Sequence, residues 1–147
     1  DIIAIGPNKY NELYSKFQNL NRLLAWGHCT VLENILAKKP CSTAISDKFA
    51  DEAVIKNALK ERGKNIQVIQ QTKAESDIAV ASASVLARAE FVKKISNLSE
   101  KYELNLPKGA SNLVLEQGKK FVKKYGKNEL KNIAKLHFKT YENIISG

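Results

Sequence analysis

The chain has 147 residues, 44% hydrophobic and 27% charged, and 24 Lys and Arg against 15 Asp and Glu give it a net charge of +9. This length and composition fit one folded domain and exclude a disordered or fibrous chain. The longest apolar run is far too short to cross a bilayer, and two cysteines exclude a disulfide framework or a cysteine-based zinc site. We therefore expect a cytoplasmic protein without a membrane span.

The excess of positive charge favours a polyanionic partner, with nucleic acid as the first candidate. A lysine-rich surface that only interacts with solvent is an equally good interpretation of the charge alone. The chain also lacks methionine and opens on an apolar segment, residues 1–5, that is typical of the end of a strand. We expect it to be part of a longer protein.

Apolar spacing and capping residues predict the elements of the first half in chain order. They are a helix over 9–17 capped by Asn8, a longer helix that starts after Asn19 or Asn21 and ends before Pro40, a strand over 41–46, a helix over 50–62 stopped by Gly63, and a strand over 65–70. This order predicts a βαβ unit with parallel strands, and its sheet is too small to stand alone.

The second half is predicted to be helical. Residues 78–88 are apolar almost all round, with serines as the sole polar residues up to 87, and such a helix is normally buried. Its pattern continues to about 102, a loop covers 104–110, Ser111 caps a helix that stops at Gly126, and Asn128 caps a last helical segment running towards 141. We expect the helix from 78 to be the most buried element of the chain.

Two acids follow the two predicted strands. Asp47 lies just past the first strand and Glu75 just past the second. Adjacent parallel strands end at the same edge of a sheet, where ligands gather, so these carboxylates are expected to lie close together. Their mutual repulsion would be relieved by a divalent cation such as Mg²⁺, held by carboxylates, water and a phosphate.

Structural interpretations of both acids stay open. Residues 72–75 match the capping-box pattern, in which Glu75 would merely close a helix start, whereas a helix beginning at Ser76 would leave Glu75 outside it. Asp47 would equally serve as a helix cap or a turn residue. Asp51, Glu52 and Asp77 have the positions of acids in a first helical turn.

Two further segments suit contacts with phosphate. Lys108 and Gly109 form a basic turn whose backbone could hold a phosphate, although a plain loop explains it too. Basic and aromatic residues interleave over 135–139, where a solvated face with two buried apolar residues is at least as good an interpretation.

Several motifs, in order along nearly the whole chain, resemble the signatures of ribonuclease HIII. They are residues 6–13 (GPNKYNEL), 24–28 (LAWGH), 71–76 (QTKAES), 79–88 (AVASASVLAR), 106–110 (LPKGA) and 135–139 (KLHFK). The acid at Glu75 and the segment 136–138 favour ribonuclease HIII over ribonuclease HII, which remains an alternative.

The resemblance implies an α/β, RNase H-like fold, here a partial sheet of parallel strands with C-terminal helices. It implies a two-metal endonuclease that cuts the RNA strand of RNA/DNA hybrids with Mg²⁺ or Mn²⁺ and leaves 5′-phosphate and 3′-hydroxyl ends. Of the family's four carboxylates, the third falls on Asp47 and the fourth on Glu75, both catalytic and metal-binding. Lys73, Lys108 and Ser111 are expected to hold phosphates of the nucleic acid.

The family's first two acids form an adjacent Asp-Glu pair in a glycine-bearing strand, and this chain has no such motif, since residues 51–52 lie after Asp47 in a helical segment. We therefore expect residues 1–147 to be the C-terminal part of the catalytic domain, without its first strands or the N-terminal substrate-binding domain. Such a chain would be weakly active or inactive alone, and a separate chain supplying the missing segment would restore it. The competing hypothesis is a basic nucleic-acid-binding module without catalysis, and a third is a scaffold that only docks on its other half.

Overall fold

The computed structural model describes residues 1–146, and the chain divides into two compact units. Unit 1 comprises residues 1–3 and 16–88, and unit 2 comprises residues 4–15 and 89–147. Helix α1 (Pro7–Phe17) belongs mostly to unit 2, and the long helix α4 (Ile78–Lys101) passes from unit 1 into unit 2.

Unit 1 is the βαβ unit that the sequence predicts. In chain order it contains helix α2 (Leu20–Lys38), strand β1 (Thr43–Asp47), helix α3 (Glu52–Ala58), the 3-10 turn η1 (Gly63–Asn65), strand β2 (Gln67–Gln71) and the 3-10 turn η2 (Ala74–Ser76). Asn19 caps α2 by accepting a hydrogen bond from the Arg22 N–H, as expected, and Asp51 caps α3 through the Ala53 N–H. Asp51 is thus a cap rather than a first-turn acid.

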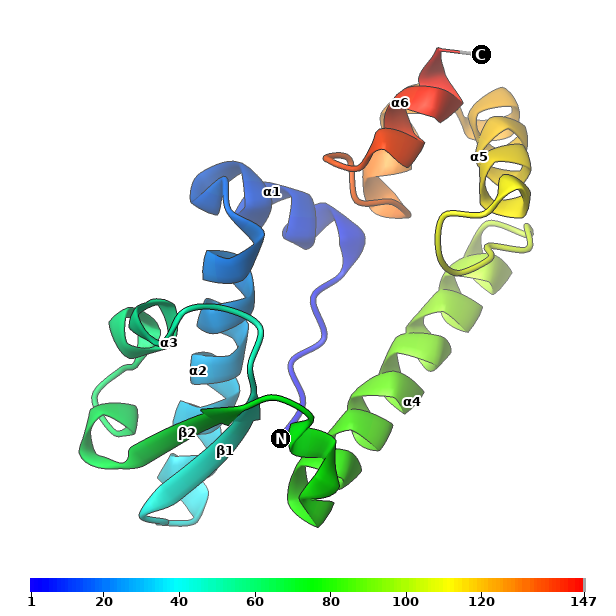
Figure 1. Cartoon of the computed structure of the whole chain (residues 1–147). Helices are drawn as coiled ribbons and strands as arrows, with labels where there is room; N and C mark the ends of the chain where they lie inside the picture. Colours follow the sequence, from blue (N-terminus) through cyan, green and yellow to red (C-terminus); the bar gives the residue numbers. More distant parts are fainter. Residues whose placement is uncertain (147) are drawn as a thin grey trace. The chain divides into compact units, whose positions relative to one another are not determined.

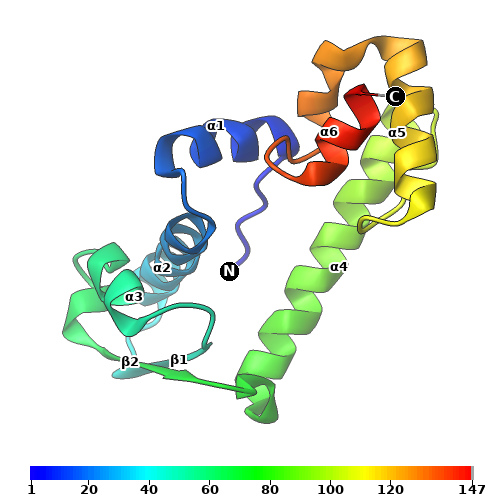
Figure 2. The ribbon, with the colours of Figure 1, turned by 45° about the horizontal axis from the view of Figure 1, so that its top comes forward.

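The two strands pair in parallel, with Ala44 opposite Val68 and Asp47 opposite Gln71. Helices α2 and α3 lie on the same face of this sheet (Figures 1 and 2). Val68 points to that face and packs on a core made by Ala25 and Cys29 of α2 and Ile55 of α3. Side chains alternate along a strand, so Asp47 belongs to the face opposite the helices.

A buried carboxylate fixes the crossover between the strands. Glu33 of α2 is 8% exposed, and its two oxygens accept hydrogen bonds from the Gly63 N–H at 2.6 Å and the Arg62 N–H at 3.2 Å. The predicted helix over 50–62 ends at Ala58 instead, because Leu59 turns to an extended conformation and the following backbone donates to Glu33. Glu33 thereby holds the backbone of the crossover that leads into β2.

Unit 2 is helical. Helix α5 (Asn112–Tyr125), the 3-10 segment η3 (Lys127–Asn132) and helix α6 (Lys139–Ile145) pack around a core of Tyr102, Phe121, Leu130 and Ile144. α6 lies so close to α5 that a Cβ on Gly118 would overlap the side chain of Ile144. The single last helix predicted from Asn128 towards 141 is therefore wrong, because the chain forms two short segments that fold back on α5.

Asn11 ties α1 to the C-terminal segment of the same unit. Its amide donates to the carbonyls of Ala134 at 2.9 Å and Lys131 at 3.1 Å, and its oxygen accepts from the Leu136 N–H at 3.0 Å. Beside it, the His137 ring stacks on Tyr14 with the ring centroids 3.8 Å apart. These contacts explain why segments 120 or more residues apart in sequence belong to one unit.

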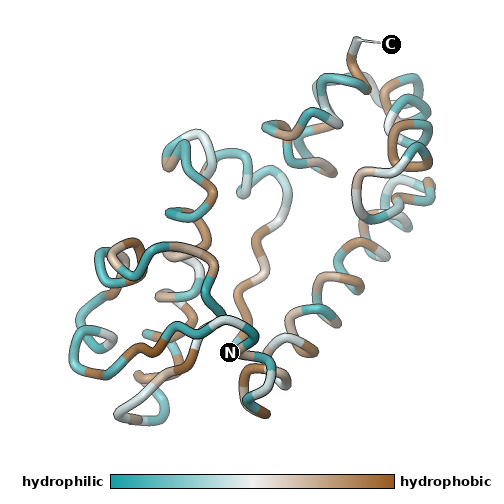
Figure 3. Tube along the Cα trace, in the orientation of Figure 1, coloured by the Kyte–Doolittle hydropathy of each residue, from teal (hydrophilic) through white to brown (hydrophobic). Residues whose placement is uncertain are grey.

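Helix α4 is not the buried element that the sequence predicts. None of its residues is buried, and Ile78 and Val85 are 84% and 68% exposed. Figure 3 shows the apolar residues of its first half along the trace. The prediction is wrong for this chain because, in the part that the structure describes, no other helix or strand packs extensively along α4. Its alanine, leucine and lysine content still favours the helical conformation.

Candidate functional site

The two strand exits of unit 1 lie side by side. Asp47 is the last residue of β1, one residue later than predicted, and pairs with Gln71, the last residue of β2. The pairing continues one residue further, since the Lys48 N–H donates to the Gln71 carbonyl at 3.0 Å. The chain segments that follow both strands therefore start from the same end of the sheet.

A side-chain hydrogen bond joins the two exits. Oδ1 of Asp47 accepts from the Ala74 N–H at 3.3 Å, and Ala74 is completely buried. Glu75 is the next residue, in the turn η2. Asp47 and Glu75 are both exposed, and neither forms an ion pair with a described residue. The structure thus attaches the turn that carries one acid to the carboxylate of the other.

Lys73 forms the corner between β2 and η2. It has a left-handed conformation with φ of 56°, unusual for a residue other than glycine and costing roughly 1–2 kcal/mol. Its carbonyl accepts from the Ser76 N–H at 3.1 Å and closes the turn. The exposed lysine side chain therefore lies two residues before Glu75, at the same end of the sheet as Asp47.

The start of α4 decides between the interpretations of Glu75. The helix begins at Ile78, and Asp77 caps it by accepting from the Ala79 N–H at 2.8 Å and the Val80 N–H at 3.4 Å. The capping-box interpretation of Glu75 is therefore wrong, and Glu75 lies outside the helix. Asp77 itself is a cap, and its place directly before the apolar run was the signal for that role.

The carboxylates of Asp47 and Glu75 are the kind of hard oxygen ligand that Mg²⁺ and Mn²⁺ prefer. Mg²⁺ is typically held by one or two carboxylates together with waters and substrate phosphates, so two acids at one end of a sheet fit such an ion. Among residues 1–146 there is no group of three or more metal-binding side chains.

Lys108 and Ser111 belong to unit 2, whereas Asp47 and Glu75 belong to unit 1. Both are exposed, in the loop before α5, where Gly109 has a φ of 93° that favours glycine. Ser111 begins α5 through its backbone carbonyl, which accepts from the Val114 N–H at 2.9 Å, and its hydroxyl makes no capping bond. The predicted cap is thus formed by the backbone alone.

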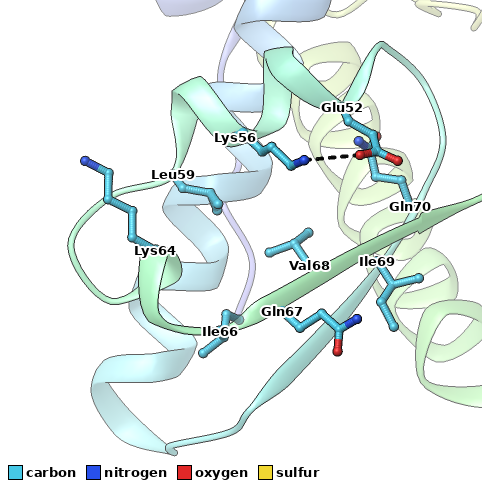
Figure 4. Close-up of a pocket in the computed structure, with 9 residues that line it drawn as sticks. All are labelled: Glu52, Lys56, Leu59, Lys64, Ile66, Gln67, Val68, Ile69 and Gln70. Atoms are coloured by element: carbon cyan, nitrogen blue, oxygen red, sulfur yellow. Dashed lines mark hydrogen bonds and ion pairs between the residues drawn. The ribbon is translucent and has the colours of Figure 1, made fainter.

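A hollow of about 530 Å³ lies between α3 and β2, lined in part by Val68, Gln70 and Lys64. Figure 4 shows its lining and the ion pair between Lys56 and Glu52, 3.3 Å apart. Asp47 and Glu75 are not among the lining residues, so this hollow is not the site of the predicted acids.

No helix within residues 1–146 has the length and apolarity needed to span a membrane.

Comparison with known proteins gives a family match over most of the chain. The model of the family described as Ribonuclease HII matches residues 8–141. Ribonuclease HIII from Chlamydia pneumoniae is 50% identical over all of this chain, and the one from Protochlamydia amoebophila is 44% identical over 98% of it. The chain spans about half the length of these curated relatives, 50% and 48% respectively.

Solved structures agree with the sequence comparison. The crystal structure of Bst-RNase HIII in complex with Mn²⁺ matches 98% of this chain and 49% of that one, with a TM-score of 0.88 and 27% identity. Aquifex aeolicus RNase H3 matches 89% of this chain and 46% of that one, with a TM-score of 0.67 and 28% identity. The fold is therefore RNase H-like, here mostly helical with a two-stranded parallel sheet. The chain belongs to the ribonuclease HII family, and its relatives are ribonuclease HIII proteins, as its motifs predicted.

Proposed function

We propose that the complete protein is an endoribonuclease that hydrolyses the RNA strand of RNA/DNA hybrids and leaves 5′-phosphate and 3′-hydroxyl ends. The observation that carries this proposal is the hydrogen bond from the Ala74 N–H to Asp47, which links the exits of two parallel strands beside Glu75. Two carboxylates without ion pairs at one end of a sheet add little to stability, but they suit the binding of a metal ion.

Asp47 and Glu75 would hold Mg²⁺ or Mn²⁺, and the structure of a relative in complex with Mn²⁺ supports this choice. Such ions activate a water as nucleophile and stabilise the leaving oxygen. Asp47 would hold the ions from the end of β1, and Glu75 would hold them from the turn η2. Lys73, two residues before Glu75, adds a positive charge that can hold a phosphate of the nucleic acid.

Lys108 and Ser111 are proposed to hold further phosphates from unit 2. An exposed lysine and hydroxyl in a loop opened by Gly109 can bond phosphate oxygens without reading sequence. We propose that the protein acts in the cytoplasm, where thiols stay reduced. Cys29 and Cys41 form no disulfide with each other, which fits this location.

We further propose that residues 1–147 form the C-terminal part of the catalytic domain. The resemblance implies four carboxylates, and this chain supplies two of them. The other pair, the first strands and a substrate-binding domain would come from a segment that corresponds to the other half of the relatives. The chain alone is expected to be weakly active or inactive.

The test combines this chain with the remaining half of the ribonuclease HIII from Chlamydia pneumoniae, which is 50% identical over the shared part. Mixing or fusing the two should produce Mg²⁺- or Mn²⁺-dependent cleavage of a labelled RNA/DNA hybrid. Asp47→Asn and Glu75→Gln should each lower the cleavage rate by at least about 100-fold, because each removes a charged metal ligand.

Asp51→Asn is the matched control, since it makes the same acid-to-amide change at a residue that only caps α3, and asparagine caps as well as aspartate. Its cleavage rate should stay within about twofold of the parent protein. Undiminished cleavage after either Asp47→Asn or Glu75→Gln would contradict the proposal. Binding of the hybrid without any cleavage would favour the non-catalytic module.

A further inference from the structure

The positive charge of the chain is concentrated in one stretch of unit 2. Residues 118–139 contain eight lysines and a single acid, Glu129. Glu129 is already engaged, because it accepts hydrogen bonds from Tyr102 at 3.2 Å and Asn132 at 2.9 Å. Of the eight lysines, Lys124 alone forms an ion pair within the described chain, with Glu103 at 3.2 Å. Seven of these lysines thus form no ion pair within the described chain, although Lys131 interacts electrostatically with Glu129.

Three of these lysines line a shallow groove between α5 and α6, two helices that lie side by side (Figures 1 and 2). Lys119 and Lys123 are one helical turn apart on α5, and Lys127 follows the reversal of the chain at Gly126, which has a φ of 82°. The floor is apolar and is formed by Val122, Ile144 and Ile145. Lysine stems can pack on such a floor while their ammonium groups stay in water.

The size of the groove indicates what it can bind. Its volume is about 250 Å³, below the roughly 300–1,000 Å³ of sites that enclose a small molecule. It therefore suits a surface contact with a ligand that continues beyond it. Lys120, Lys131, Lys135 and Lys139 lie outside the groove in the same lysine-rich stretch of the chain.

Aromatic side chains accompany the basic surface at its far end. Nζ of Lys135 lies 4.6 Å from the centroid of the Tyr10 ring and 5.9 Å from that of Phe138, and Phe138 is 45% exposed. Surfaces that bind single-stranded nucleic acids combine a basic groove for the phosphates with aromatic rings on which bases stack. An acidic protein segment would match the charge but would make no use of this ring.

We propose that the groove between α5 and α6 and its flanking lysines bind the phosphate backbone of a nucleic acid. This contact uses residues other than Asp47, Glu75, Lys73, Lys108 and Ser111. The identity of that nucleic acid as an RNA/DNA hybrid rests on the proposed function, whereas the electrostatic contact itself does not.

The experiment measures binding of a fluorescently labelled RNA/DNA hybrid to the 147-residue chain by anisotropy. It is done in EDTA, so that no cleavage occurs, and over a series of salt concentrations. A variant with Lys119→Gln, Lys123→Gln and Lys127→Gln is compared with a control carrying Lys16→Gln, Lys39→Gln and Lys64→Gln. The control loses the same charge from exposed, unpaired lysines of unit 1.

Each lysine that contacts a phosphate contributes about 0.9 to the slope of log K against log salt. The groove variant should therefore lose about 2 to 3 from this slope, and the control less than about 1. A single Lys123→Gln change should lose about 1, which keeps the test valid if the triple variant folds poorly. Replacing the three groove lysines by arginine should leave the slope unchanged.

Equal losses in the groove variant and the control, or no loss in either, would overturn the proposal in favour of a diffuse charge effect. Polyglutamate serves as the second probe. If the groove variant loses polyglutamate binding and keeps hybrid binding, the partner is an acidic protein and the proposal is wrong. Because the binding is measured in EDTA and without cleavage, failed cleavage in the reconstituted enzyme would leave this result standing.

Discussion

Units 1 and 2 differ in the kind of core they have and in the amount of positive charge they carry. Unit 1 packs small and aliphatic side chains against a two-stranded sheet and has eleven Lys and Arg against eight Asp and Glu. Unit 2 packs aromatic rings among helices and has thirteen Lys and Arg against seven Asp and Glu. Under the two proposals above, the strand ends of unit 1 position acids and the helical surface of unit 2 attracts a polyanion.

The chain carries a natural probe for each unit. Its one tryptophan, Trp26, lies in unit 1, and all five tyrosines lie in unit 2. Selectively excited tryptophan fluorescence and the tyrosine signal in near-ultraviolet circular dichroism therefore report the two units separately.

Phe121→Ala is expected to have the largest effect. Phe121 is completely buried and packs edge-on against Tyr102 with the ring centroids 5.0 Å apart. Its truncation should lower the free energy of unfolding of unit 2 by about 3–5 kcal/mol, through lost burial and a cavity. The tyrosine transition should shift well ahead of the tryptophan transition in urea. Leu113→Ala in the same helix, at a residue 46% exposed, should cost under about 1 kcal/mol.

If the tyrosine and tryptophan transitions instead coincide and shift together, the two units unfold as one cooperative structure, and this prediction is wrong.

Glu33→Ala tests unit 1. The change leaves the N–H groups of Gly63 and Arg62 without their acceptor, and the Gly63 backbone is buried. We expect a loss of about 2–3 kcal/mol, seen in the tryptophan transition. Glu61→Ala, at an exposed acid of the same crossover, should change the unfolding free energy by less than about 0.5 kcal/mol. Equal effects of the two changes would show that the buried acid does not hold the crossover.

The smallest effect concerns acidity. Burial, and then the charge of Lys135, lower the pKa of His137 below its ordinary value of 6.5. The folded chain thus holds the imidazole neutral where the unfolded chain already protonates it. This contribution to stability is present above pH 6.5 and is lost as the pH falls below it. His137→Gln should remove less than about 1 kcal/mol of that pH dependence, because the ring is only partly buried.

The measurement is the tyrosine-detected melting temperature of both proteins above and below this pH. Burial also lowers the pKa of His28, but His28 lies in unit 1 and is the same in both proteins. A larger loss of stability on acidification in the variant than in the parent would show the opposite sign and refute the assignment.

The sequence was sufficient for features that depend on local patterns. An Ile- and Val-rich segment and the order of helices and strands predicted the parallel pair of strands. The same order placed Asp47 and Glu75 just past neighbouring strands, and Asp47 proved to be the last residue of its strand. The roles of these acids in binding metal remain predictions. The Glu33 contact was missed, although its signal was present, since Glu33 lies four residues after the buried Cys29 on the same helical face.

Other features depend on contacts that a sequence pattern does not specify. The apolar residues of α4 predict burial, but nothing in their spacing says whether the same chain contains a covering element. The left-handed backbone of Lys73 was equally hidden, because lysine is no signal for that conformation. The break after η3 followed from tertiary packing of Leu130 and Ile144 rather than from a helix stop signal.

The strand register has one consequence for any change to the crossover. With Asp47 opposite Gln71, the aspartate belongs to the face away from α2 and α3, and the Ala74 N–H reaches it. A slip of β1 by a single residue would turn the Asp47 carboxylate towards the apolar face covered by the helices. The Ala74 N–H before Glu75 would then lose its hydrogen bond to Asp47. Insertions of odd length near Thr43 should therefore be far less tolerable than loop changes elsewhere, however mild they look in the sequence.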